Sequence, residues 1–450
     1  MGQQIKKSIV VSNGTFEGGF NRAVNNILMI AFQYPPFGES SGIQRTLKFS
    51  SYLRDFGWQP VVLTAHPRAY SRIGDEQLGE IPPNVPLKRA FALDAARHLS
   101  IGGRYPRWIA LPDRWASWWF GAVPHGLRLI RKYRPTVIWS TYPIATAHLV
   151  GLTLQRLTGI PWVADFRDPM TDTDPKTGTE YPLDPSIRRA NGWLERLAVR
   201  HCRYAVFTTP STLRMYAARY PEIPVSRWRM IENGYDEDNF VAAEKCLAHR
   251  SSSSGRVVLV HSGALQPSIR HPRAFFAALA DLQQMGLISS KNFRVVLRAS
   301  GNEEYYRQHI RACGIEEIVN LEPSIPYQDA LREMLCADGL LIFQASNCNL
   351  QVPGKLYEYL RARRPIFAMT DPEGDTAGIL KAAGIGAIVP LDSKEEIISG
   401  LRSFLTQLSE GTVAIGNNED VSAHSRRSRT LQLAELLDAL VRCDQRGRQT

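Results

Sequence analysis

Short apolar runs alternate with longer amphipathic stretches along most of the chain. The first run, residues 27–31 (ILMIA), has the length and composition of a buried strand. A helix is expected from about Ile43, with Gly57 in the position of its C-terminal cap, and residues 61–63 (VVL) form the next strand. A strand, a helix and a second strand in this order predict a right-handed crossover with parallel pairing.

The same alternation continues and predicts two groups of parallel strands. In the first half, strands are expected at residues 137–139, 162–164 and 205–207, with helices at 145–157 and 193–202. In the second half, strands are expected at 257–260, 294–297, 319–321, 340–343, 366–368 and 387–389, separated by helices such as 275–285, 330–336 and 395–408. The chain is therefore predicted to be an α/β protein. It should have two Rossmann-like, doubly wound domains facing across a cleft, with ligands at the carboxyl ends of the strands.

Changes in composition divide the chain into four parts. Residues 1–26 are polar and glycine-rich and are expected to form a flexible extension. An N-terminal domain is expected over 27–235, because an Asn233-Gly234 turn follows its last strand, and a C-terminal domain over 236–420. Residues 421–450 are expected to form a terminal amphipathic helix, whose leucines share one face, and a basic tail.

The composition narrows the class of protein. The chain has 450 residues, 44% hydrophobic and 22% charged, which suits two or three domains and excludes collagen-like, mucin-like and disordered proteins. No apolar run approaches the roughly 18 residues that span a bilayer, and the apolar stretch near the start is too short for a secretory signal. The six cysteines contain no CxxC pair, which favours free thiols in a reducing compartment. A cytoplasmic protein is expected.

The charge balance favours anionic partners. Lysine and arginine total 54 against 43 aspartate and glutamate residues, a formal net charge of +11. Because no zinc finger, RNP-like aromatic motif or basic heptad region accompanies this charge, no nucleic acid is expected as a partner. Phosphate-bearing small molecules and anionic lipid are the expected partners.

The segment with the clearest chemistry is residues 352–366, VPGKLYEYLRARRPI. A Pro353-Gly354 turn that opens a helix presents backbone N–H groups and the positive end of the helix dipole to an anion. Lys355 adds a positive charge in the first turn, and Glu358 can accept hydrogen bonds from two neighbouring ribose hydroxyls. The other interpretation is an ordinary helix start whose lysine and glutamate face solvent.

This segment is similar to the donor-site motif of family-4 glycosyltransferases, which have the GT-B fold. Residues 27–64 resemble that family's first strand, glycine loop and helix, and residues 137–169 resemble its bacterial polysaccharide branch. Asn233-Gly234 matches the turn after the first domain, and His261-Ser262-Gly263 matches the turn after the first strand of the donor domain. Five matches follow one another in the family's order, so the chain resembles a glycosyltransferase of polysaccharide biosynthesis.

The resemblance implies transfer of a hexosyl or related sugar from a UDP- or GDP-linked donor to an acceptor hydroxyl, with retention of configuration. It implies no cofactor and no metal, because helix dipoles and basic side chains hold the leaving diphosphate. Lys355 is expected to steady the diphosphate and Glu358 to hold the ribose. The other donor-binding residues that it implies are Pro353 and Gly354 at the phosphates, Gly263 where the diphosphate approaches the chain, and Ile325 and Pro326 beside the nucleobase.

Three positions depart from the family pattern. Leu350 lies eight positions before Glu358, where the family often has an acidic residue. Arg363 occupies the position of a glycine that usually ends the helix. The basic pair that binds phosphate after the first donor-domain strand is not cleanly present, and Arg270 is the nearest substitute.

The first domain is expected to supply the catalytic residues Asp168, Arg167 and Gly42. Asp168 and Arg167 follow the strand at 162–164 and should face the cleft, where an adjacent acid and base suit sugar hydroxyls or an incoming nucleophile. The other interpretation is a structural arginine–aspartate pair that fixes the loop. Gly42, together with Gly38, is expected to line the reaction centre.

Histidines are not expected to act as the base. Better-known branches of the family have a histidine after the preceding strand, where this chain has residues 140–142 (STY). The leaving phosphate can itself serve as base in a front-face transfer. His148 is interpreted as a packing residue within a helix, and His261 either as a site residue or as a strand cap.

Residues 104–133 combine tryptophan with basic side chains. The residues concerned are Trp108, Trp115, Trp118 and Trp119 with Arg104, Arg107, Arg114 and Lys132. This pattern fits a membrane-interface surface and predicts peripheral contact with an anionic membrane, at the inner face of the cell membrane. Lipid-linked acceptors are common in the family, so a glycan or lipid-linked acceptor is expected. The alternative is a helix whose tryptophans pack into the first domain.

Two other functions stay open from the sequence. A nucleotide-sugar 2-epimerase shares this architecture but should show carboxylate and histidine groups converging on the sugar, and no clear set is seen. A non-catalytic GT-B partner protein is compatible with Leu350 and Arg363. A dehydrogenase is disfavoured because no GxGxxG follows the first strand. The preferred interpretation is a glycosyltransferase of cell-envelope polysaccharide or glycoconjugate assembly.

Overall fold

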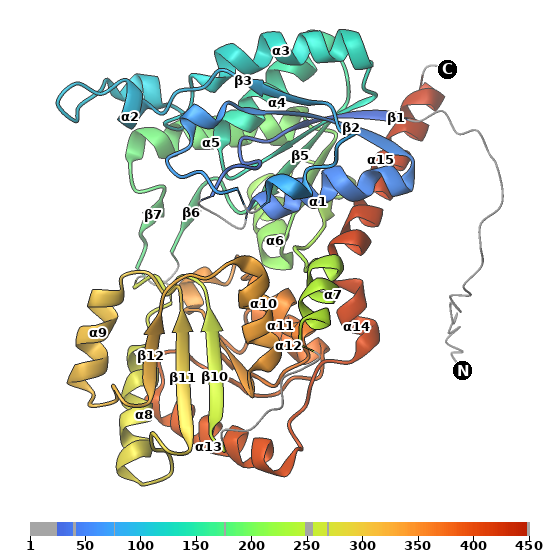
Figure 1. Ribbon diagram of the computed structural model, residues 1–450. Helices are drawn as coiled ribbons and strands as arrows, with labels where there is room; N and C mark the ends of the chain where they lie inside the picture. Colours follow the sequence, from blue (N-terminus) through green and yellow to red (C-terminus); the bar gives the residue numbers. More distant parts are fainter. Residues whose placement is uncertain are drawn as a thin grey trace, which may run out of the picture.

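The computed structural model describes residues 25–38, 42–75, 77–174, 177–247, 255–267 and 270–447. These residues form two α/β domains, each built on one parallel sheet with helices packed against it (Figure 1). The predicted α/β class with two doubly wound domains is therefore confirmed. The extension predicted for residues 1–26 lies outside the described residues, except that Asn25 and Asn26 already belong to the first strand.

The N-terminal sheet has seven strands in the order β3-β2-β1-β4-β5-β8-β9. They are β1 (Asn25–Ile30), β2 (Trp58–Ala65), β3 (Leu87–Ala90), β4 (Val137–Thr141), β5 (Trp162–Arg167), β8 (Tyr204–Phe207) and β9 (Trp228–Met230). The helices are α1 (Ile43–Tyr52), α2 (Ala95–His98), α3 (Trp118–Tyr133), α4 (Ala145–Thr158), α5 (Pro185–His201) and α6 (Pro210–Arg219). A hairpin of β6 (Asp172–Thr173) and β7 (Glu180–Tyr181) extends from this domain towards the second one (Figure 1).

The C-terminal sheet has six strands in the order β12-β11-β10-β13-β14-β15. They are β10 (Val257–Ser262), β11 (Phe293–Arg298), β12 (Val319–Glu322), β13 (Gly339–Phe343), β14 (Ile366–Met369) and β15 (Ile388–Val389). The helices of this part of the chain are α7 (Glu237–Lys245), α8 (Arg273–Gln284), α9 (Glu303–Ala312), α10 (Tyr327–Cys336), α11 (Lys355–Ala362), α12 (Asp375–Ala382), α13 (Lys394–Glu410) and α14 (Asn418–Ala423), followed by α15 (Arg426–Gly447), which packs on the first domain. The carboxyl ends of β10, β11 and β12 point towards the N-terminal domain (Figure 1).

The apolar pattern misses two strands of the first sheet. Strand β3 (LKRA) and strand β9 (WRM) lie at the two edges of the sheet, and each contains a single buried residue. An edge strand pairs on one side only and does not need a continuous apolar run. Backbone pairing with β2 and β8 therefore defines them, and their side-chain pattern does not.

The chain crosses between the domains twice, and the two crossings pair with each other. The Tyr235 amide donates to the His424 carbonyl over 3.2 Å, and the Arg426 amide donates to the Tyr235 carbonyl over 2.7 Å. A Cβ atom on Gly234 would lie 2.3 Å from the His424 carbonyl oxygen. The Asn-Gly turn therefore contains glycine because a second chain segment passes against it.

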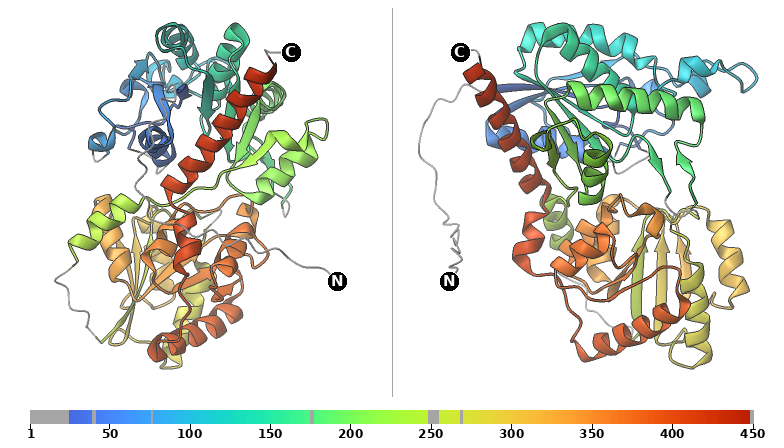
Figure 2. Two further views of the ribbon diagram at one scale, coloured as in Figure 1. Left: turned by 90° about the vertical axis from the view of Figure 1, so that its right-hand side faces the viewer. Right: turned by 180° about the vertical axis from the view of Figure 1, so that it is seen from behind.

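The second crossing leads into α15, which returns to the N-terminal domain (Figure 2). Its leucine face, with Leu433, Leu436, Leu437 and Leu440, is buried in one cluster with Ile27, Leu47 and Trp139 of the first domain. The Trp58 indole N–H donates to Asp438 Oδ1 over 3.0 Å and adds a polar contact to this interface. The amphipathic stripe in the terminal segment is thus the surface that joins the end of the chain to its beginning.

Three of the four tryptophans assigned to a membrane surface pack into the first domain instead. Trp118 is fully buried, Trp115 donates to the Ala69 carbonyl over 3.2 Å, and Trp119 donates to Thr153 Oγ1 over 2.9 Å. An indole buries well where its N–H finds an acceptor, and two of these three find one. Only Trp108 stays in solvent, with 74% of its side chain exposed. Within the described residues, no helix is both long and apolar enough to cross a bilayer.

Candidate functional site

Helix α11 begins directly after the Pro353-Gly354 turn, at the carboxyl edge of the second sheet. Its buried side chains Leu356, Tyr357, Tyr359 and Leu360 anchor it against the domain core. Residues three apart share a helix face, so Lys355 and Glu358 lie together on the face that is not anchored, and both are half-buried. The helix ends at Arg363, which adopts the left-handed conformation (φ 52°) usually taken by glycine.

Lys355 contacts the turn after β10, at His261 and Gly263. The His261 Nδ1 lies 2.8 Å from the Leu341 carbonyl oxygen, which can only accept, so Nδ1 carries the proton. The other ring nitrogen, Nε2, is therefore an acceptor and lies 3.0 Å from Lys355 Nζ. A Cβ atom on Gly263 (φ +115°) would lie 2.9 Å from the same Nζ atom. Gly263, assigned to the approach of the diphosphate, also provides the space that Lys355 occupies.

The charge on Lys355 is poorly stabilised in this position. Burial and the nearby Arg270 guanidinium lower the pKa of Lys355 to about 7, and Glu358 acts in the opposite direction. Burial and the Lys355 charge also lower the pKa of His261 well below its usual value, so the imidazole is neutral. An anion bound here would stabilise the ammonium form of Lys355.

Arg270 lies in the loop after β10, close enough to act on both Lys355 and His261 electrostatically. The only hydrogen bond of its guanidinium in the described part of the chain runs from Nη1 to the Ala264 carbonyl at 3.5 Å, and its Nε has no partner there. Burial lowers the pKa of Arg270. The structure thus brings three predicted donor residues, Gly263, Arg270 and Lys355, together around one point.

Glu358 accepts a hydrogen bond of 2.7 Å from the Tyr327 hydroxyl. Burial raises the pKa of the Glu358 carboxyl, while the Tyr327 hydroxyl, Arg426 and Lys355 act against the rise. Tyr327 directly follows Ile325 and Pro326, so the turn predicted to flank the nucleobase does lie beside the residue predicted to hold the ribose. Sequence reasoning did not identify Tyr327, although it belongs to the same turn, residues 324–327 (SIPY).

Arg426, the first residue of α15, is a second site residue that the sequence did not indicate as such. Its guanidinium interacts electrostatically with Glu358 and Tyr327, and burial lowers its pKa. Within the described residues, it has no ion pair or side-chain hydrogen bond. Two neighbouring arginines of α15 have structural roles, because Arg427 pairs with Asp55 and Arg429 pairs with Glu232.

The main-chain carbonyl of Leu350 has a role that its side chain does not indicate. It accepts hydrogen bonds from Thr209 Oγ1 (2.9 Å) and Thr212 Oγ1 (2.6 Å), at the start of α6 in the other domain. Beside them, Ser211 donates twice to Asp375, with both bonds 2.9 Å long. The loop between β13 and α11 is therefore held by the N-terminal domain at the position where the family often has an acid.

The carboxyl edge of the first sheet is organised by a buried ion pair that sequence reasoning missed. Arg45 donates to both carboxylate oxygens of Asp165, over 2.9 and 2.8 Å, and its other N–H groups reach the carbonyls of Ile231 and Glu232. Thr141 Oγ1 donates to the same carboxylate over 2.8 Å. The structural acid in this region is thus Asp165, and its partner comes from α1.

Arg167 and Gly42, both predicted to be catalytic, are in contact. Arg167 has a left-handed backbone (φ 59°), and its Nη1 lies 3.2 Å from the Gly42 carbonyl oxygen and 3.3 Å from that of Tyr142. Burial raises the pKa of the adjacent Asp168, and Arg167 acts against the rise. Gly38 packs closely against another loop of the same domain, because a Cβ atom there would lie 2.9 Å from the Gly74 amide nitrogen.

His148 is a packing residue. Its ring is fully buried against Phe166, its Nδ1 lies 2.8 Å from Ser140 Oγ, and burial lowers its pKa to about 4. It therefore stays neutral near neutral pH and is enclosed by the core of the first domain.

A cavity of about 720 Å³ lies between the β6–β7 hairpin and the carboxyl edge of the second sheet. Asp174 and Thr177 line it from the first domain, and Asn347 and Asp371 are among the residues that line it from the second. None of the predicted site residues in the described part of the chain lines this cavity. Nor do the described residues contain a group of three or more histidine, cysteine or acidic side chains placed to hold a metal ion.

The fold is that of the GT-B glycosyltransferases, with two Rossmann-like domains whose carboxyl edges face one another. Residues 42–234 match the family described as glycosyl transferase 4-like domain. This match covers most of the first domain, from the residue before α1 to the Asn-Gly crossing. It confirms the resemblance to family-4 glycosyltransferases that the sequence motifs indicated.

Solved structures of the same architecture cover nearly the whole chain. Sucrose-phosphate synthase from Thermosynechococcus elongatus is 13% identical, with a TM-score of 0.67 over 93% of this chain and 100% of that one. WaaG, a glycosyltransferase involved in lipopolysaccharide biosynthesis, is 13% identical, with a TM-score of 0.60 over 91% and 99%. The UDP-GlcNAc 2-epimerase from Neisseria meningitidis is 11% identical, with a TM-score of 0.52 over 92% and 99%. Identities this low establish a shared fold only. A search of curated proteins finds no match.

Proposed function

We propose that this glycosyltransferase moves a hexosyl or related sugar from a UDP- or GDP-linked donor to an acceptor hydroxyl with retention of configuration. The observation that supports the proposal is the pair Lys355 and Glu358 on one face of α11, with Arg270, Arg426 and Tyr327 around it. The cations suit a diphosphate, and the carboxylate suits two vicinal ribose hydroxyls.

In this proposal the diphosphate binds at the start of α11. Lys355 leaves His261 and pairs with the diphosphate, Arg270 adds a second positive charge, and the helix dipole adds to both. The bond between the anomeric carbon and the leaving phosphate oxygen breaks, and a bond to the acceptor oxygen forms on the same face of the sugar. The acceptor proton passes to the leaving phosphate, while Asp168 and Arg167 orient the acceptor hydroxyl from the opposite domain. Neither cofactor nor metal takes part.

A 2-epimerase is the weaker candidate. Its histidine would have to reach the sugar, but His261 is held between Leu341 and Lys355, and His148 is enclosed in the core. The family match to the first domain also favours a transferase.

We further propose a glycan or lipid-linked acceptor, reached at the inner face of the cell membrane during cell-envelope polysaccharide or glycoconjugate assembly. The supporting surface is smaller than the sequence predicted: Ile101 (89% exposed) and Trp108 (74% exposed), near Arg104 and Arg107. Exposed apolar side chains beside arginine suit an anionic bilayer surface. Loss of co-sedimentation with anionic vesicles in Trp108→Ala tests this contact, with Met285→Ala, at an exposed apolar position of the second domain, as control.

Calorimetric titration with UDP and with GDP, in the presence of EDTA, tests the donor site. We expect saturable binding of one nucleotide, weakened at least about tenfold by Glu358→Ala, since hydrogen bonds to a charged group contribute about 1.5–3 kcal/mol. Glu373→Ala, at an exposed carboxylate of the same domain, is the matched control. Transfer from the corresponding nucleotide sugar, with the product's anomeric configuration read by NMR, tests retention. Binding without any transfer would favour a non-catalytic partner protein, and equal binding by Glu358→Ala would refute the site.

A further inference from the structure

A groove of about 610 Å³ lies on the N-terminal domain between α5 and α6. None of the residues assigned to the donor site or the reaction centre lines it. Its lining includes Thr171, three residues after Asp168 in the chain, and four arginines with one tryptophan. The groove therefore starts near the segment that carries the candidate catalytic residues.

One face of α5 supplies most of the groove's charge. Arg189, Trp193, Arg196 and Arg200 recur at intervals of four, three and four residues and form a stripe about 16 Å long on that face. The opposite face of α5 is buried through Leu194, Ala198 and Val199. The Trp193 side chain is 60% exposed in the middle of the stripe. An indole in this position stays unburied unless a ligand covers it.

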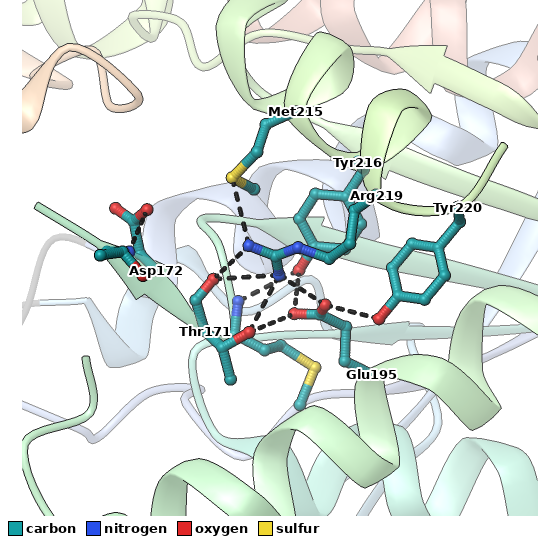
Figure 3. A network of polar contacts seen from close by, with 9 residues as sticks. Thr171, Asp172, Glu195, Met215, Tyr216, Arg219 and Tyr220 are labelled. Atoms are coloured by element: carbon teal, nitrogen blue, oxygen red, sulfur yellow. Dashed lines mark hydrogen bonds and ion pairs between the residues drawn. The ribbon is translucent and has the colours of Figure 1, made fainter. Parts of the chain in front are cut away.

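The inner wall of the groove is held rigid by Glu195, which is only 1% exposed (Figure 3). Its carboxylate accepts hydrogen bonds from the hydroxyls of Tyr216 and Tyr220, both 2.8 Å long. Arg219 Nη1 donates to it over 2.7 Å. All of these partners come from within the protein, so the Glu195 carboxylate does not neutralise the positive charge of the arginines in the α5 stripe.

The α5 arginines are left with little compensating charge. Arg200 forms one solvent-exposed ion pair, of 3.4 Å, with Glu222. Arg189 donates to the Pro185 carbonyl, and within the described residues neither Arg189 nor Arg196 forms an ion pair. Exposed arginines flanking an exposed indole, over a preformed wall, have the chemistry of a site for an anion that also has an apolar face.

We propose that this groove binds an acidic oligosaccharide, with a sugar ring packed on Trp193 and its carboxylate or phosphate substituents paired with the α5 arginines. Guanidinium groups match carboxylate and phosphate in geometry and charge. A membrane fits less well, because a bilayer receives protruding apolar side chains, whereas this site is concave and has one central indole. This role rests on the proposed function: such a glycan would be the acceptor, with its chain extending from the region of Asp168 along the groove.

Titration calorimetry with a trimer of galacturonic acid, against the neutral galactose trimer, tests the groove in the full-length protein. We expect the acidic trimer to bind and the neutral one to bind at least about tenfold more weakly. Trp193→Ala should weaken acidic-trimer binding about tenfold, Trp193→Phe should retain most of it, and Arg196→Ala should weaken it about threefold. Arg128→Ala, an exposed arginine on α3, is the matched control and should change nothing. UDP or GDP binding should be the same in all variants, which separates this site from the donor site.

Three results would overturn the proposal. The first is equal binding of both trimers, or binding of neither. The second is acidic-trimer binding that Trp193→Ala leaves unchanged. The third is binding of anionic lipid vesicles that depends on Trp193 while the trimer does not bind, which would assign the groove to a membrane.

Discussion

The carboxyl edges of the two sheets carry similar charged side chains but use them in opposite ways. At the first sheet, Arg45 is bonded to both oxygens of Asp165 and to two carbonyls of the chain crossing. At the second sheet, Lys355 contacts a neutral imidazole, and the Arg270 guanidinium has one long hydrogen bond. The Arg45–Asp165 pair is satisfied within the protein, whereas neither Lys355 nor Arg270 forms an ion pair within the described residues.

This difference separates the structural role of a buried charge from its binding role. A buried ion pair with every hydrogen bond formed holds its elements in place, and removal of one partner is costly. A buried cation without an anionic partner destabilises the free protein and gains when an anion binds. The Arg45–Asp165 pair therefore joins α1, β5 and the crossing, while Lys355 and Arg270 are available to a diphosphate.

The largest effect is expected on the free energy of unfolding, when the Arg45–Asp165 ion pair is broken. Asp165→Ala leaves the Arg45 charge buried and unpaired and should lower the free energy of unfolding by about 3–5 kcal/mol. Lys355→Met removes a desolvated cation and should leave stability unchanged or raise it. Denaturant unfolding followed by circular dichroism measures both variants. An equal loss of stability in the two would contradict the contrast between the edges.

A smaller effect appears in the pH dependence of donor binding. Lys355 is faced by His261 from β10, Arg270 from the following loop and Glu358 from its own helix. Because the pKa of Lys355 is about 7 in the free protein, nucleotide binding above pH 7 must be accompanied by proton uptake. The Kd for UDP or GDP should therefore rise up to about tenfold per pH unit between pH 7 and 9.

Calorimetry in two buffers of different ionisation enthalpy measures this uptake directly, and it should approach one proton per nucleotide. Lys355→Met should bind more weakly, with a nearly flat pH profile over the same range. A wild-type profile as flat as that of the variant would show that Lys355 does not hold the diphosphate.

The smallest expected effect concerns the contact between the edges. Thr209→Val and Thr212→Val each remove a hydroxyl that donates to the Leu350 carbonyl, and each should weaken the domain contact by about 1 kcal/mol. The double variant should have a larger radius of gyration in X-ray scattering than the wild type. Thr406→Val, at an exposed position on α13, is the control. An unchanged radius in the double variant would show that these hydrogen bonds do not hold the domains together.

Much of the fold could be predicted because a buried parallel strand appears in the sequence as a short continuous run of apolar residues. Strand β1 and the six strands of the second sheet begin and end within two residues of the expected apolar runs. The edge strands β3 and β9 could not be found this way, since their pairing with neighbours defines them. The stripe of leucines in α15 was visible, but its burial on the first domain depends on the chain crossing back.

The site divides along the same line. Lys355 and Glu358 are three residues apart on one helix, so their shared face follows from helical geometry alone. Arg426 and Tyr327 reach Glu358 from distant parts of the chain, and Arg45 reaches Asp165 across 120 residues. No local sequence pattern identifies such partners, because they are brought together only when whole helices and strands pack against one another.

The two α/β domains, the family resemblance and the α11 motif could be recognised in the amino-acid sequence, because each depends on residues that are neighbours in the chain. The three-dimensional packing was needed to show which charged side chains form ion pairs within the protein and which are available to a ligand. It paired Asp165 with Arg45 of α1, packed three tryptophans that had suggested a membrane surface against the first domain, and left Trp193 in solvent. The physical reason is that the state of a charge or an indole depends on what packs against it, and that is set by residues far away in the chain.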